Sequence, residues 1–208
     1  MKFAAPSTLL MAALSLTAVF AFAADGNPNA GKAKAAPCGA CHGPDGNSVN
    51  PMWPKLAGQN AIYIARQVKA IRSGQGRENP QSATMRTLVV NLSDTDLYDI
   101  AAFYATQTSS VEEAAASDVE IGGKLFRGGD AKAGIPACMS CHGPAGEGVA
   151  SAGYPRIAGQ HAQYTVGQLN AFRDGSRSTD INKMMRSIAA RLSNKQIEAL
   201  ARYLSGLH

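Results

Sequence analysis

Apolar residues near the end of each half of the chain recur with the spacing of a helix. Each stripe follows a serine that stands three residues before a capping-box partner, Asp96 after Ser93 and Gln196 after Ser193. The pattern predicts a capped helix at the end of each half. The apolar positions stand at i, i+3, i+4 and i+7, one hundred residues apart: Leu97, Ile100, Ala101 and Tyr104, then Ile197, Leu200, Ala201 and Leu204.

A second pair of helical segments lies in the middle of each half. Residues 61–71 and 162–172 are each followed shortly by a glycine, Gly74 or Gly175, the residue type that most often ends a helix. No stretch shows the alternation that is typical of strands. We therefore expect an all-α fold.

Alignment of the chain with itself shows that these helices belong to a tandem repeat. "MRTLVVNLSDTDLYDIAAFYATQ" from Met85 matches "MRSIAARLSNKQIEALARYLSGL" from Met185, and "WPKLAGQNAIYIARQVKAIRSG" from Trp53 matches "YPRIAGQHAQYTVGQLNAFRDG" from Tyr154. A period this long indicates a duplicated structural unit. We expect two homologous domains, residues 24–110 and 119–208, joined by an acidic, alanine-rich linker at 111–118.

The first 23 residues have the pattern of an export signal. Lys2 supplies a positive charge, an apolar stretch runs from Leu9 to Phe22, and "AFA" at 21–23 is typical of a signal-peptidase site. The stretch is shorter than the roughly 20 residues of a membrane span, and an uncleaved anchor is the alternative. We expect residues 1–23 to be a signal peptide and the mature protein to lie in the periplasm.

All four cysteines lie in two C-x-x-C-H pentads, "CGACH" and "CMSCH". In an exported chain such pairs could form disulfides, act as redox dithiols or join histidines in a zinc site. None of these explains a histidine directly after the second cysteine in both copies, whereas C-x-x-C-H is the haem c attachment pattern. The pentads predict two covalent haems c, held by Cys38 and Cys41 and by Cys138 and Cys141, with His42 and His142 as axial iron ligands.

The second axial ligand of each iron is expected to be a methionine, the usual partner of histidine in cytochromes c. Met85 follows His42 by 43 residues, and Met185 follows His142 by the same 43 residues. Met52 has no counterpart in the second domain. Core packing is the ordinary role of a methionine, but the repeated spacing favours Met85 and Met185.

Two further features bear on the ligands. His161 has no histidine as its counterpart in the first domain, so we expect it to be a surface or locally hydrogen-bonded residue. Pro54 and Pro155 follow the pentad histidines by twelve and thirteen residues. Their carbonyls could hold the other ring nitrogen of each histidine, and a rigid turn over the haem edge is a compatible interpretation.

Together these motifs resemble the class I cytochromes c, and the tandem pair is similar to the cytochrome c4 family. The resemblance covers nearly the whole mature chain and rests on C-x-x-C-H-G-P, P-[KR]-[LI]-A-G-Q, the Met-Arg pairs and "YLSGLH" at the end. It implies that the carbonyls of Pro54 and Pro155 hold the ligating histidines. It also implies that the N- and C-terminal helices of each domain cross, in the second domain with Gly122 and Phe126 against Leu200 and Tyr203. In the first domain Gly31 and Ala35 stand at the positions of Gly122 and Phe126, so that this crossing matches the family less well.

Electron transfer follows from the ligand set, because an iron with two protein ligands has no open position for a substrate. The family resemblance implies transfer between respiratory complexes and a terminal oxidase, often loosely at the membrane. We expect redox proteins as partners, neither nucleic acid nor a small-molecule substrate, and no enzymatic activity. The alternatives are a two-haem peroxidase or thiosulfate-oxidising enzyme, and the cytochrome subunit of a flavocytochrome-type sulfide dehydrogenase.

The charge distribution adds a prediction about docking. The whole chain has a net charge of +5, but residues 24–110 hold eight basic and six acidic residues, whereas residues 121–208 hold eleven and five. We expect the second domain to face an acidic partner. The basic residues that flank Met185 and Pro155 are expected to contribute most, namely Lys183, Arg186 and Arg156. Their first-domain counterparts, Lys55 and Arg86, are expected to contribute less.

Overall fold

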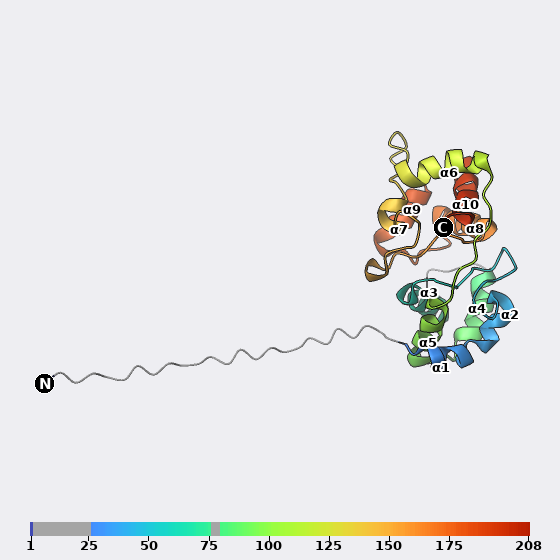
Figure 1. The fold of residues 1–208 in the computed structure, drawn as a ribbon, viewed down its shortest axis with the longest axis vertical. Coiled ribbons are helices and arrows are strands. Elements are labelled where there is room, and N and C mark those ends of the chain that lie inside the picture. The colour runs from blue at the N-terminus through green and yellow to red at the C-terminus, as the bar shows by residue number, and fades with distance from the viewer. Residues whose placement is uncertain (2–25, 76–79) are drawn as a thin grey trace.

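The computed structural model describes Met1, residues 26–75 and residues 80–208. The expected signal peptide, apart from Met1, lies outside the described residues. Figure 1 shows the described chain as two groups of helices stacked along the long axis of the molecule, the first group below and the second above. In the described parts of the chain, no helix combines the length and the apolar character that crossing a membrane requires.

The two groups of helices are built alike, and the expected all-α fold is confirmed. Among the described residues there are no strands, only two isolated β-bridges in the second group. The first group comprises α1 (Pro28–Lys34), α2 (Gly39–His42), α3 (Ala61–Ser73), α4 (Pro80–Val89) and α5 (Asp94–Ala105). The second comprises α6 (Ala116–Gly128), α7 (Met139–His142), α8 (Ala162–Asp174), α9 (Met184–Ala189) and α10 (Asn194–Ser205).

The cap geometry confirms the predicted starts of α5 and α10 and the predicted ends of α3 and α8. The Ser93 and Ser193 side chains accept from the backbone N–H three residues on, and complete capping boxes are present at the starts of α5 and α10. Gly74 and Gly175 end α3 and α8 in the left-handed conformation. These signals are local, which is why the sequence alone predicts them.

Each domain encloses its own apolar core around its last helix. In the first domain the core is centred on Leu97 and Tyr104, and in the second on Phe126 and Ile197, all of them at most 2% exposed. The cores share no residue, so each domain buries apolar surface independently of the other.

The terminal helices cross in both domains at a glycine. A Cβ added to Gly122 would lie 2.4 Å from the Ala199 carbonyl oxygen, and the Phe126 ring lies 5.6 Å from that of Tyr203. In the first domain a Cβ on Gly31 would lie 1.9 Å from the Asp99 carbonyl oxygen. The first-domain crossing is therefore as close as the second, although an alanine stands where the second domain has Phe126.

Adding a methyl group at this crossing is expected to destabilise the second domain. Gly122→Ala must push α6 away from α10, which lowers the free energy of unfolding by about 1–3 kcal/mol. Gly167 lies in α8 of the same domain with nothing within 4 Å of its added Cβ. Gly167→Ala should instead raise the free energy by about 0.5–1 kcal/mol through helix propensity. Denaturant unfolding of both haem-loaded variants checks the pair, and equal effects would contradict this account of the crossing.

The expectation for His161 is wrong, because this residue is buried between the domains. It is 7% exposed and stands at the start of α8. Its Nδ1 lies 2.8 Å from Glu112 Oε1, and its Nε2 lies 2.8 Å from the Ser48 carbonyl oxygen of the first domain. Both ring nitrogens therefore have partners far away in the sequence, and the ring helps to join the domains.

A buried arginine crosses the same boundary. Arg177 is 4% exposed and donates to Tyr63 Oη at 2.6 Å and to Gln67 Oε1 at 3.0 Å, both in α3 of the first domain. Its guanidinium also lies 4.3 Å from the centre of the Phe172 ring. The contact between the domains thus consists largely of desolvated polar groups with defined partners.

Candidate haem sites

Each C-x-x-C-H pentad forms a single helical turn. Cys38 caps α2 and Cys138 caps α7, and each histidine ends its helix. Residues three and four positions apart in a helix share one face. The second cysteine and the histidine of each pentad therefore lie on the same side as the first cysteine, as attachment to one flat group requires.

The thiols do not fit the redox-dithiol or zinc alternatives. All four cysteines are unpaired. Burial raises the pKa of the Cys38 thiol, and it raises that of Cys138 to about 11, whereas a reactive dithiol needs a lowered pKa. Within the described residues, no three histidine, cysteine or acidic side chains gather as zinc ligands do. The cysteines are thus placed as attachment points, each pair beside one histidine.

Both pentad histidines are buried and oriented by a proline carbonyl. The Nδ1 atoms of His42 and His142 each lie 2.9 Å from the carbonyl oxygens of Pro54 and Pro155. A carbonyl only accepts, so Nδ1 carries the proton and Nε2 keeps the lone pair that a metal requires. The hydrogen bonds implied by the family resemblance are confirmed.

The protonation state of these histidines suits ligation. Burial lowers the pKa of both His42 and His142, and it outweighs the opposing effect of the hydrogen bond to the proline carbonyl. Both rings are therefore neutral near neutral pH, and only the neutral imidazole binds a metal. The donor set of each domain fits haem c.

Met185 and the first cysteine of the second pentad pack against the same apolar core. Met185 lies at the start of α9, is partly buried and packs against the same apolar cluster as Cys138 and Ile157. Met85 lies in α4 and is also partly buried. Met52, in contrast, is 41% exposed. The axial role of Met85 and Met185 remains a prediction.

An aspartate that the sequence analysis missed fixes the start of α9. The Asp180 side chain is 4% exposed and accepts from Arg186 Nε at 2.7 Å and from the Arg186 backbone N–H at 3.0 Å. Asn182 and Lys183, between them, have positive φ angles of 52° and 59°. This tight turn sets the direction in which Met185 enters the core. In the sequence, only the spacing between Asp180 and Arg186 could have indicated the turn.

Two of the five basic residues named in the docking prediction lie at the boundary between the domains: Arg156, a predicted docking residue, and Lys55, a first-domain counterpart. Lys55 is 5% exposed, and its Nζ donates to the Ser110 carbonyl oxygen at 3.1 Å. The Nε of Arg156 is buried without a hydrogen-bond partner. The use of Lys55 as a surface charge is thus wrong, because its side chain is buried and its ammonium group contacts Ser110 and Glu112 where the linker begins. Arg86 and Lys183 are exposed, and Arg186 is engaged by an aspartate.

Comparison with known proteins extends this picture. The family described as "Cytochrome c" matches residues 29–108 and again residues 119–208. The chain is 49% identical over 191 residues to cytochrome c4 of Azotobacter vinelandii, covering 89% of this chain and 91% of the relative. It is 37% identical over 175 residues to a "Thiosulfate dehydrogenase electron acceptor" of Stutzerimonas stutzeri, covering 82% and 78%. The crystal structure of reduced recombinant cytochrome c4 from Pseudomonas stutzeri is similar with a TM-score of 0.83 at 47% identity, covering 88% of this chain and all of that one.

Proposed function

The chain belongs to the cytochrome c4 family of the cytochromes c, and we propose that it carries electrons in the periplasm from a respiratory complex toward a terminal oxidase. Membership makes the chain an electron-transfer protein with two haems c, one for each pentad. The observation that carries the proposal is the repeated unit itself, in which a proline carbonyl orients the histidine of each pentad at the same 2.9 Å.

The proposed roles of the residues follow from this unit. The cysteine pairs would hold the haems, the pentad histidines would bind iron through Nε2, and Met85 and Met185 would supply its other protein ligand. Haem iron supplies one-electron chemistry when bound. With a histidine and a methionine as ligands, each iron would have no open position for a substrate, and the burial of both histidines supports a carrier without enzymatic activity.

The proposed periplasmic location rests on the first 23 residues, which have the pattern of a cleaved signal peptide. We place the domains at 24–110 and 119–208, joined by 111–118. The observations that support these bounds are the separate cores and the coil before α6, although α6 takes in the last residues of the linker.

The docking proposal is tested by reversing one exposed charge beside Met185. Electron transfer to a terminal oxidase should slow as salt is added, because the Debye length falls from about 10 Å at 0.1 M to about 3 Å at 1 M. Lys183→Glu should lower the rate several-fold at low salt. Stopped-flow oxidation of the reduced protein, followed against ionic strength, measures both effects.

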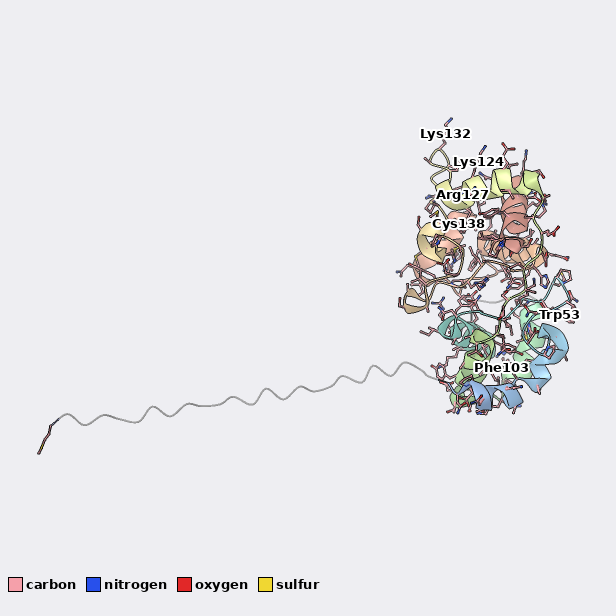
Figure 2. All side chains as sticks on the ribbon, viewed as in Figure 1. Trp53, Phe103, Lys124, Arg127, Lys132 and Cys138 are labelled. Atoms are coloured by element: carbon pink, nitrogen blue, oxygen red, sulfur yellow. The ribbon has the colours of Figure 1, made fainter. Side chains whose placement is uncertain are left out.

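Lys132→Glu is the matched control, since it makes the same charge change in the same domain. Figure 2 shows Lys132 at the end of the second domain that points away from the first. This variant should transfer electrons at the wild-type rate. Rates that do not depend on salt, or equal losses in both variants, would contradict docking beside Met185.

The relative that accepts electrons from thiosulfate dehydrogenase favours a second candidate for the donor. The chain would then take electrons from a dehydrogenase of reduced sulfur compounds instead of a respiratory complex. Reduction of the purified protein by thiosulfate in the presence of such an enzyme, faster than by respiratory membranes, would support this donor. Stable co-purification with a flavoprotein would instead indicate the cytochrome subunit of a sulfide dehydrogenase.

A further inference from the structure

Two glutamines cross the boundary between the domains, and each pairs with the backbone of the other domain. Gln59 Oε1 accepts from the Arg156 N–H at 2.9 Å, and Gln59 Nε2 donates to the Arg156 carbonyl at 2.8 Å. Gln160 forms the same pair with Lys55, at 2.9 Å and 3.0 Å. Each side chain thus uses its donor and its acceptor on one residue of the opposite domain.

The N–H groups that these glutamines bind belong to the two peptide groups whose carbonyl oxygens accept from the Nδ1 atoms of His42 and His142. In the first domain, the peptide between Pro54 and Lys55 accepts from His42 through its oxygen and donates to Gln160 through its N–H. The peptide between Pro155 and Arg156 links His142 to Gln59 in the same way. One planar amide therefore separates each histidine from a glutamine of the other domain.

Amide resonance couples the two ends of such a peptide. An acceptor on the N–H draws electron density toward the carbonyl oxygen, so that the oxygen becomes a stronger acceptor for the histidine Nδ1–H. A stronger bond at Nδ1 makes the imidazole a more basic ligand, which favours the ferric state and lowers the reduction potential.

The glutamines are held firmly enough to transmit this effect. Gln59 and Lys55 are 7% and 5% exposed, so water does not compete freely for these groups. Each glutamine oxygen also accepts from the next N–H of its own chain, at Asn60 (2.9 Å) and at His161 (3.1 Å). Those two residues are the N-cap residues of α3 and α8, so each glutamine side chain is anchored next to a helix of its own domain.

We propose that Gln59 and Gln160 are positioning residues that set the reduction potential of the haem in the opposite domain, acting through the peptide that holds its histidine. This inference rests on the proposed function, which makes His42 and His142 iron ligands. Its consequence is crossed control, in which the first domain adjusts the second haem and the second domain adjusts the first.

The test uses the isosteric variants Gln59→Met and Gln160→Met in the haem-loaded full-length protein. Gln59→Met should raise the potential of the second-domain haem, and Gln160→Met that of the first. The ferric–ferrous equilibrium should shift several-fold, up to about tenfold, which is 59 mV for one electron. Potentiometric titration gives both potentials, and Met85→Ala and Met185→Ala assign each potential to its domain.

A second measurement and a control separate this role from simple loosening of the interface. The NMR signal of the Nδ1 proton should move in the histidine opposite the variant and stay unchanged in the other. Thr179→Val removes the 3.1 Å hydrogen bond to Gln67 across the same boundary, and with it the 3.4 Å hydrogen bond from Arg177 Nε. It touches neither peptide and should move neither potential.

The outcomes distinguish failure of this inference from failure of the proposed function. Potentials that do not move, or that move equally in both domains of one variant, overturn the inference and leave the proposed function standing. Effects of Thr179→Val as large as those of the glutamine variants also overturn it. A wild-type protein without haem overturns the proposed function, and the inference with it.

Discussion

The purified wild-type protein should exceed the mass of its mature polypeptide by two haems, and removal of either cysteine pair should remove one of them. Thioether bonds survive denaturation, so intact-mass spectrometry in denaturing solvent measures attachment directly. Cys38→Ala with Cys41→Ala should retain only the second haem, and Cys138→Ala with Cys141→Ala only the first. Each pentad is a separate helical turn in a separate domain, so neither attachment depends on the other.

Removal of a cysteine pair should also have the largest effect on folding. A domain of about 85 residues buries too little surface to be more than marginally stable, and haem supplies the centre of its core. Each double variant should therefore lose about half of the helical circular dichroism while the other domain, with its own core, persists. A wild-type mass that matches two disulfides without haem would contradict the whole account of the pentads.

Removing the proposed axial methionines should change each haem separately. Met85→Ala should abolish the sulfur-to-iron charge-transfer band of one ferric haem, and Met185→Ala that of the other. Each variant should also lower the affected potential, because methionine favours ferrous iron. The change should be a sizeable part of the roughly 0.8 V over which axial ligands set haem potentials. Visible spectra with potentiometric titration measure both effects.

Met52→Ala is the control for this pair. Met52 lies in the stretch without a counterpart in the second domain and is 41% exposed, so its removal should leave both bands and both potentials unchanged. Loss of a band in Met52→Ala, with the band intact in Met85→Ala, would show that the repeated spacing of 43 residues does not identify the ligand.

The sequence predicts those parts of this fold that depend on neighbouring residues. The capping boxes at Ser93 and Ser193 and the glycines after α3 and α8 act within one turn of a helix, so short patterns suffice to find them. The pentad histidines are found for a similar reason, because haem attachment needs its residues within one turn.

The contact between the domains could not be predicted in this way. His161 and Lys55 are polar residues, and nothing near them in the sequence indicates that they are buried at the contact between the domains. Their partners lie as many as 113 residues away. The glutamines of the repeated P-[KR]-[LI]-A-G-Q motif were visible as a match between domains, but their roles depend on how the two copies face each other.

Gln59 pairs with residue 156, and Gln160 pairs with residue 55. These contacts are reciprocal, as in an isologous dimer, where the same surface of each subunit contacts the other. At these glutamines the chain thus resembles a two-fold assembly of two homologous domains, joined by a short covalent connection. Such a connection raises the effective concentration of one half around the other to the millimolar range. Because the contact is intramolecular, its closure does not depend on the concentration of the protein.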